Sequence, residues 1–205
     1  PMLEIQHRMN RRVMSLVSGT YGPSYRPHPS VAEHLLSGLP GVAEDFLTTT
    51  PLLWIDTAGY GAEEERDPVT LSLRNPAEAS LAARLAGLLL EFGVGPEDIA
   101  LIAPYSAQVA LLRRLLPAVR SDTVNAFQGS EREAVICSFV RSSEGGELGF
   151  VSDPRRLTVA ATRGRRLWIG IGDSATLGRC PHFSRLFDAI EAGGCWQSIW
   201  DWAVE

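Results

Sequence analysis

The feature that most constrains the fold of this chain is a regular alternation of strand-like and helix-like segments after residue 51. Short apolar runs, which predict buried strands, are followed by segments with apolar residues at helical spacing. Strands that are apolar on both faces are typical of a parallel sheet covered by helices on both sides. We therefore expect an α/β three-layer fold with a mainly parallel sheet, whose strands span residues 52–56, 99–103, 122–125, 134–140 and 167–172.

The expected helices lie between these strands. Asn75-Pro76 is a strong start signal, because asparagine caps a helix and proline fits its first position, and the helix is expected to run to Phe92. Further helices are expected at residues 106–116, 155–162 and 182–192. The first fifty residues are less regular, with helices expected at 10–18 and 30–36.

The basic side chains limit the chemistry of this chain, since its 19 Lys+Arg residues are all arginines. A complete phosphate-binding P-loop needs a lysine that reaches the β- and γ-phosphates, and a Schiff-base enzyme needs a reactive lysine. The chain by itself is therefore neither a P-loop ATPase nor a Schiff-base enzyme.

The net charge of −5 argues mildly against a nucleic-acid partner, but the arginines are unevenly distributed. Ten arginines and six carboxylates lie within residues 103–166, whereas the rest of the chain holds nine arginines and eighteen carboxylates. The basic excess thus sits in one stretch.

Three widely spaced cysteines, Cys137, Cys180 and Cys195, predict neither a zinc site nor a disulfide framework, and we expect no metal ligands in this chain. No apolar run is long enough to span a membrane and no signal peptide is evident, so we expect a cytoplasmic protein without membrane contact. A proline ahead of the first methionine suggests a piece of a longer protein.

Three segments carry clusters of polar groups that we expect to follow strands, at the carboxyl edge where open parallel sheets bind ligands. The segments are T-V-N-A-F-Q-G-S-E-R-E at 123–133, D-P-R-R-L-T-V-A-A-T-R-G-R at 153–165, and Q-H-R-M at 6–9. Two further patterns, N-P-A-E-A at 75–79 and P-Y-S-A-Q at 104–108, lie between them.

In their order along the chain, the five motifs resemble those of the second RecA-like domain of superfamily 1 helicases. The branch is the one typified by the nonsense-mediated-decay RNA helicase, senataxin and the immunoglobulin-mu-binding helicase. The resemblance implies a RecA-like three-layer sandwich over residues 1–205, as the carboxy-terminal motor domain of a longer protein.

The resemblance also implies a nucleotide site. Arg163 and Arg8 match the two arginines that reach the γ-phosphate of ATP as arginine fingers. Glu131 matches the carboxylate that holds the ribose hydroxyls, and Gln128-Gly129 matches the turn that couples the nucleotide to the nucleic acid. His7 replaces the usual tyrosine that stacks on adenine, and we place it at the nucleotide, with packing as the alternative.

On the nucleic-acid side, the resemblance places Thr123 at a backbone phosphate and Pro104, Tyr105 and Ser106 beside the strand. For Tyr105 the alternative is an ordinary half-buried aromatic at the end of a strand. Asn125 stands where the family has an aspartate, a change that affects how the loop is braced. Such contacts follow the backbone and stack on bases without reading sequence.

Two functions follow. The first is the carboxy-terminal half of an ATP-dependent DNA or RNA helicase or translocase, which binds a single strand. ATP and Mg²⁺ would be held mainly by an absent N-terminal RecA-like domain, so the fragment alone is expected to be inactive. The alternative is a degenerate, non-catalytic RecA-like scaffold.

Two segments have simpler interpretations. The segment 195–205 is expected to be a terminal amphipathic segment, because Trp196, Ile199 and Trp200 fall at helical spacing. We expect it to close the sheet as a helix, or to form a docking surface. Glu63-Glu64-Glu65 is expected to be a solvated loop.

Overall fold

A six-stranded parallel sheet forms the centre of the computed structural model, which describes residues 4–22, 24–143, 145, 148–193 and 195–202. The five predicted strands are all present, but the one expected at 122–125 spans Arg120–Thr123, and residues 124 and 125 lie in a turn. A sixth strand lies at one edge of the sheet. In sheet order the strands are β10 (Trp196–Ser198), β3 (Leu52–Asp56), β9 (Gly164–Gly172), β8 (Arg132–Ser138), β6 (Ile99–Ala103) and β7 (Arg120–Thr123).

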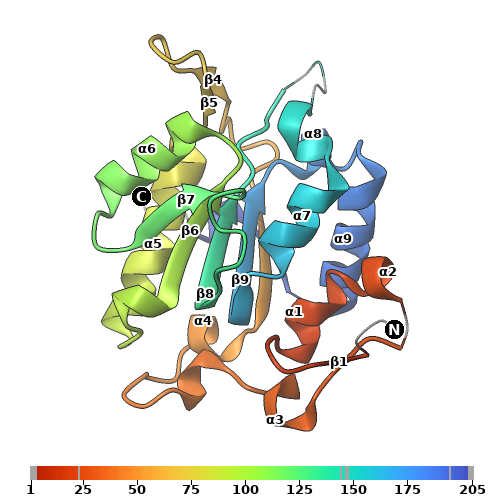
Figure 1. The fold of residues 1–205 in the computed structure, drawn as a ribbon. Coiled ribbons are helices and arrows are strands. Elements are labelled where there is room, and N and C mark those ends of the chain that lie inside the picture. Colours follow the sequence, from red (N-terminus) through yellow and green to blue (C-terminus); the bar gives the residue numbers. More distant parts are fainter. Residues whose placement is uncertain (1–3, 23, 144, 146–147, 194, 203–205) are drawn as a thin grey trace.

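Helices cover both faces of this sheet, as Figure 1 shows. One face carries α5 (Pro76–Glu91) and α6 (Ser106–Leu115), and the other carries α1 (Arg11–Ser15), α7 (Pro154–Ala161) and α9 (Pro181–Gly193). Each face has its own apolar core. The predicted three-layer α/β fold of RecA-like type is therefore confirmed.

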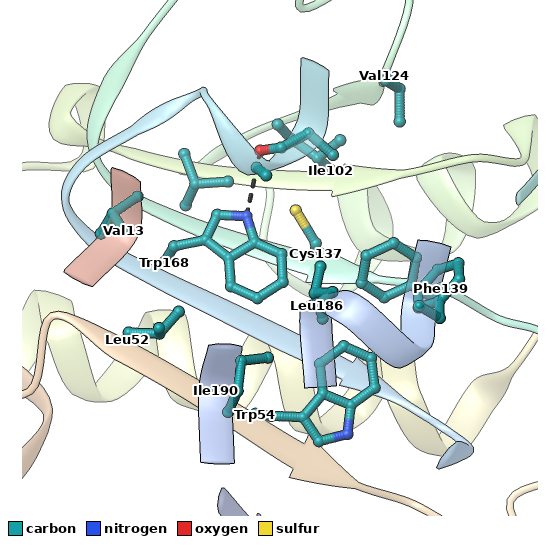
Figure 2. Close-up of a cluster of buried hydrophobic side chains, with 14 of the residues drawn as sticks. Val13, Leu52, Trp54, Ile102, Val124, Cys137, Phe139, Trp168, Leu186 and Ile190 are labelled. Atoms are coloured by element: carbon teal, nitrogen blue, oxygen red, sulfur yellow. Dashed lines mark hydrogen bonds between the residues drawn. The ribbon is translucent and has the colours of Figure 1, made fainter. Parts of the chain in front are cut away.

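Strand β3 shows how both cores are built from one run of apolar residues. Its successive side chains point to opposite faces, so Leu52 and Trp54 enter one core whereas Leu53 and Ile55 enter the other. In the first core, shown in Figure 2, the indole nitrogen of Trp168 donates a hydrogen bond to the Ala160 carbonyl oxygen at 3.1 Å. This bond joins β9 to α7 and so fixes the chain just before Arg163.

The helix signals at Asn75 are confirmed, because its side chain accepts a hydrogen bond from the backbone N–H of Glu78 at 3.1 Å. The amino-terminal helices are shorter than expected. The predicted helix 10–18 divides into α1 and α2 (Ser18–Tyr21), and 30–36 becomes α3 (Pro29–Ala32) and a 3₁₀ turn at Leu36–Gly38. The remaining short elements are β1 (Ile5–Gln6), β2 (Arg26–Pro27), α4 (Phe46–Thr49), β4 (Glu65–Arg66), β5 (Leu73–Arg74) and α8 (Ser174–Leu177).

The tail does not form the expected helix. Trp196, Gln197 and Ser198 form strand β10, which pairs with β3 in parallel, and a 3₁₀ turn follows at Ile199–Asp201. The open edge of β3 supplies unpaired backbone groups, and the Trp54 N–H donates to the Cys195 carbonyl oxygen at 2.9 Å. The helix prediction was wrong because backbone hydrogen bonds to the edge of β3 outweigh the helical spacing of apolar residues in so short a segment. Residues 203–205 lie outside the described part of the chain.

Among the described residues, no helix is both long enough and apolar enough to cross a bilayer. Cys137, Cys180 and Cys195 are buried free thiols, and Figure 2 shows Cys137 among the core side chains. A cytoplasmic location stays a prediction.

Candidate functional site

Glu131 and Arg163 lie side by side at the amino ends of neighbouring strands. Glu131 directly precedes β8 and Arg163 directly precedes β9, and the Arg132 N–H donates to the Arg163 carbonyl oxygen at 3.0 Å. Arg8 reaches this point from the start of the chain and forms an ion pair with the Glu131 carboxylate. The fold therefore brings together three residues that are far apart in sequence.

The position of Arg8 depends on a turn braced by Gln6. The Gln6 side-chain oxygen accepts hydrogen bonds from the backbone N–H groups of Arg8 and Met9, both at 2.7 Å, and its amide donates to the Met9 carbonyl oxygen. Met9 is buried in the core and anchors the turn. The Q-x-R-M pattern thus has a local cause, since glutamine closes the turn and methionine fastens it.

The guanidinium of Arg163 is held by neutral oxygen atoms. It donates to the Val159 and Ser130 carbonyl oxygens at 2.9 and 3.0 Å, and to the Thr162 hydroxyl at 2.8 Å. Burial lowers the pKa of Arg163 and the charge of Arg8 lowers it further, whereas Glu131 raises it. An arginine keeps its charge despite such a shift, so Arg163 adds a positive charge beside the Glu131 carboxylate. That carboxylate forms ion pairs with Arg8 and, at 3.8 Å, with Arg165. This arrangement suits a polyanionic ligand.

The expectation that all three polar segments lie at the carboxyl edge of the sheet was wrong for part of them. Thr123 does end β7 at that edge, but Glu131 and Arg163 lie at the amino edge. The loop 124–131 returns the chain from one edge to the other, because β7 and β8 run in the same direction. The candidate residues therefore form two groups at opposite edges.

The other nucleotide candidates, His7, Gln128 and Gly129, are exposed residues around the group formed by Arg8, Glu131 and Arg163. His7 is exposed and stacks on His28, with ring centroids 4.3 Å apart. Gln128 and Gly129 are exposed in the returning loop, where Gly129 has a φ of 85° that favours glycine. Gly129 directly precedes Ser130, whose carbonyl oxygen binds Arg163. Their nucleotide roles stay predictions.

The nucleic-acid candidates gather at the carboxyl edge. Pro104, Tyr105 and Ser106 follow β6, and Thr123 pairs with the last residue of that strand, Ala103. The Thr123 hydroxyl accepts from the Ala126 N–H at 3.3 Å, which braces the loop that contains the exposed Asn125.

The tyrosine ring in this group is buried, with 7% of Tyr105 exposed. Its hydroxyl accepts a hydrogen bond from Arg141 at 3.5 Å. Arg141 in turn forms an ion pair with Glu64 at 2.7 Å, so one member of the acidic run is a partly buried brace and not a solvated side chain. The prediction of a solvated loop at 63–65 was wrong at this position, because the partner lies 77 residues away in sequence.

Two of the five motifs turn out to build the domain interior. Gln108 donates to the Asn75 carbonyl oxygen at 3.0 Å and to the Ser138 hydroxyl at 2.8 Å. The Ser138 hydroxyl and the Val140 N–H both donate to the Glu78 carboxyl group, at 2.6 and 2.8 Å. This buried network connects α5, α6 and the end of β8 directly beneath the carboxyl edge.

Comparisons with known proteins identify the family. A family model described as "AAA domain" matches residues 1–175. The mouse protein "DNA replication ATP-dependent helicase/nuclease DNA2" is 31% identical over 216 residues, which cover 93% of this chain and 20% of the relative. The chain belongs to the superfamily 1 helicases.

Two further relatives have higher identity to this superfamily 1 helicase domain. The mouse "DNA-binding protein SMUBP-2" is 43% identical over 198 residues, which cover 94% of the chain and 20% of the relative. The "DNA polymerase alpha-associated DNA helicase A" of Schizosaccharomyces pombe is 39% identical over 185 residues, covering 85% of the chain and 28% of the relative. The chain thus spans well under a third of these relatives' length, and the predicted family is confirmed.

Proposed function

We propose that this chain is the carboxy-terminal motor domain of an ATP-dependent superfamily 1 helicase or translocase. The observation that carries the proposal is the group formed by Arg8, Glu131 and Arg163 at the amino edge of the sheet. A scaffold domain has no use for a nucleotide-binding group that combines Arg8, Arg163 and Glu131. The second function, a non-catalytic scaffold, is therefore disfavoured.

We assign the remaining nucleotide contacts to an absent N-terminal RecA-like domain. That domain would supply the P-loop lysine, the Mg²⁺ ligand and the water-activating glutamate, because this chain contains no lysine. ATP with Mg²⁺ supplies a phosphoryl group whose negative charge spreads over its oxygens during transfer. The guanidinium donors of this chain fit such a group.

The two arginines would contribute differently. Arg163 is fixed in place by three hydrogen bonds, so its charge is oriented in advance. Arg8 is held by an ion pair with Glu131 and is partly exposed, so it must exchange this partner to reach a phosphate. Glu131 would then be free to accept hydrogen bonds from ribose hydroxyl groups.

We further propose single-stranded DNA as the strand that the carboxyl edge binds. The mouse relative is named a DNA-binding protein and the Schizosaccharomyces pombe relative a DNA helicase, which supports DNA. Strand separation by the complete protein on matched DNA and RNA duplexes, each with a 5′ or a 3′ overhang, tests both polymer and polarity. Activity on RNA alone would reject the choice of DNA.

The substitution Arg163→Ala tests the motor directly. In the complete protein we expect it to lower the rate of ATP hydrolysis by about 10³-fold, since it removes the arginine finger. Binding of a single strand should be unchanged, because Arg163 lies at the other edge of the sheet.

The matched control is Arg185→Ala, which removes an exposed arginine from α9. It should change neither hydrolysis nor binding. An equal loss of hydrolysis and of binding in Arg163→Ala would show that Arg163 supports folding, and the arginine-finger role would be abandoned.

A further inference from the structure

An exposed aromatic ring lies beside the predicted nucleic-acid contacts and belongs to none of the five motifs. Phe150 lies in a 3₁₀ turn at Gly149–Ser152, just before α7, and is 58% exposed. Exposing a phenylalanine ring to this extent leaves a large apolar area in water. The ring therefore has a solvent-exposed apolar surface that a partner can cover.

The surroundings of Phe150 place it at the carboxyl edge of the sheet. Its ring contacts Tyr105 edge-on, with centroids 6.1 Å apart and an angle of 69° between the planes. Together with Pro104 and Val124 it lines a small, mainly apolar pocket over the ends of β6 and β8. All three of these neighbours come from segments that the motifs assign to the nucleic-acid strand.

A cation is already placed against one face of the ring. The guanidinium carbon of Arg156 lies 4.6 Å from the centroid of Phe150, a cation–π arrangement. Arg156 also forms an ion pair with Asp153 at 3.8 Å, and the exposed Arg155 precedes it in the sequence. The surface around the ring is therefore aromatic and basic, which is the combination that nucleobases and phosphates bind.

A second arginine–phenylalanine pair in the same domain shows what a structural pair looks like. Arg120 lies 4.3 Å from the centroid of Phe127, but Phe127 is fully buried. That ring supports the loop 124–131 from within and has no surface for a ligand. The Phe150 pair has similar geometry and differs in its exposure.

We propose that Phe150, with Arg156 on one face, is a stacking platform for a base of the single strand. A base would stack on the free face of the ring, and Arg156 would lie near the strand's phosphates. This inference rests on the proposed function, because it assumes that a single strand runs over the ends of β6 and β7. It adds a base contact to an edge where Tyr105 itself is buried.

The test measures binding of a fluorescein-labelled thymidine oligonucleotide to the complete protein by fluorescence anisotropy at low salt. Phe150→Ala should weaken binding roughly 5- to 150-fold, the range expected for one lost base stack. Phe150→Tyr keeps a ring and should bind within about 3-fold of wild type. The control Phe46→Ala removes another exposed ring, which lies on α4 and contacts Trp202, and should leave binding unchanged.

A second readout separates stacking from a structural role. On an oligonucleotide that lacks bases, wild type and Phe150→Ala should bind equally. In Phe150→Trp, added thymidine strand should quench tryptophan fluorescence more than it does in Phe46→Trp, even if Phe150→Ala fails to fold.

The outcomes are distinct. No binding of any single strand by the wild-type protein would reject the proposed function, and the platform with it. Wild-type binding that Phe150→Ala retains in full, or no extra quenching in Phe150→Trp, would overturn the platform alone.

Discussion

At the scale of single residues, the environment of Glu78 has the clearest chemical consequence. Its side chain is fully buried in α5 and receives hydrogen bonds from Ser138 and Val140. Burial raises its pKa to about 8, although these hydrogen bonds act in the opposite direction. In the unfolded chain this group ionises near its ordinary pKa of 4.5. Between about pH 4.5 and 8 the unfolded state therefore releases a proton that the folded state keeps, and stability falls as pH rises.

Replacing Glu78 by glutamine should remove this dependence, since a neutral amide cannot ionise. We expect the free energy of unfolding of Glu78→Gln, minus that of wild type, to be larger at pH 8 than at pH 5. Urea denaturation at the two pH values measures this difference. Glu91→Gln, at an exposed position of the same helix, is the control and should show no such gain. The same difference at both pH values would contradict the buried-carboxyl explanation.

The motifs predicted which residues matter here, but not what each one does. Asn75, Glu78 and Gln108 belong to two recognised patterns, and only the structure shows that they are a buried brace. Phe150 carries no motif, because its exposure and its contact with Tyr105 depend on how three segments meet. Such roles depend on the fold and not on local pattern.

At the scale of secondary-structure elements, four of the five predicted strands are largely buried on both faces, whereas β7 at the sheet edge is only partly buried. Residues 52–56 and 99–103 coincide with β3 and β6. Strand β10 could not be predicted in this way, since its three residues are only partly buried and depend on the free edge of β3. Local periodicity finds the centre of the sheet better than its edge.

The contact between β3 and β9 is close enough to require glycine at residue 170. A methyl group there would lie 2.6 Å from the Trp168 ring and would also clash with the Trp54 ring. We expect Gly170→Ala to lower the free energy of unfolding by about 1–3 kcal/mol, the usual cost of overpacking a core. Gly87→Ala, in open space on α5, should instead raise it by up to about 1 kcal/mol. Urea denaturation measures both, and a neutral Gly170→Ala would show that the two rings can move apart.

At the scale of the whole molecule, the two candidate sites lie at opposite edges of one sheet. The loop 124–131 connects them, and buried Phe127 holds it against the core. A conformational change at one end of this loop can therefore be transmitted to the other edge of the sheet through only a few residues. The order of the motifs could not predict this separation, because each segment looked like a loop that follows a strand.

A domain built in this way should not turn over ATP alone. We expect the purified 205-residue chain to hydrolyse ATP at the background rate, since it has no lysine for the phosphates. The variant Arg163→Ala of the same chain is the control for contaminating activity. ATP turnover that this substitution abolishes would mean that the proposed N-terminal RecA-like domain is not required for hydrolysis.

The three buried thiols also make the domain suitable for site-specific labelling. Burial raises the pKa of Cys137 and of Cys195, and only the deprotonated thiol reacts with a maleimide, so the native cysteines should react slowly. A cysteine introduced at an exposed loop position, as in Ala126→Cys, would then be the fast-reacting group. A fluorophore attached there would report on the conformation of the loop between the two candidate sites.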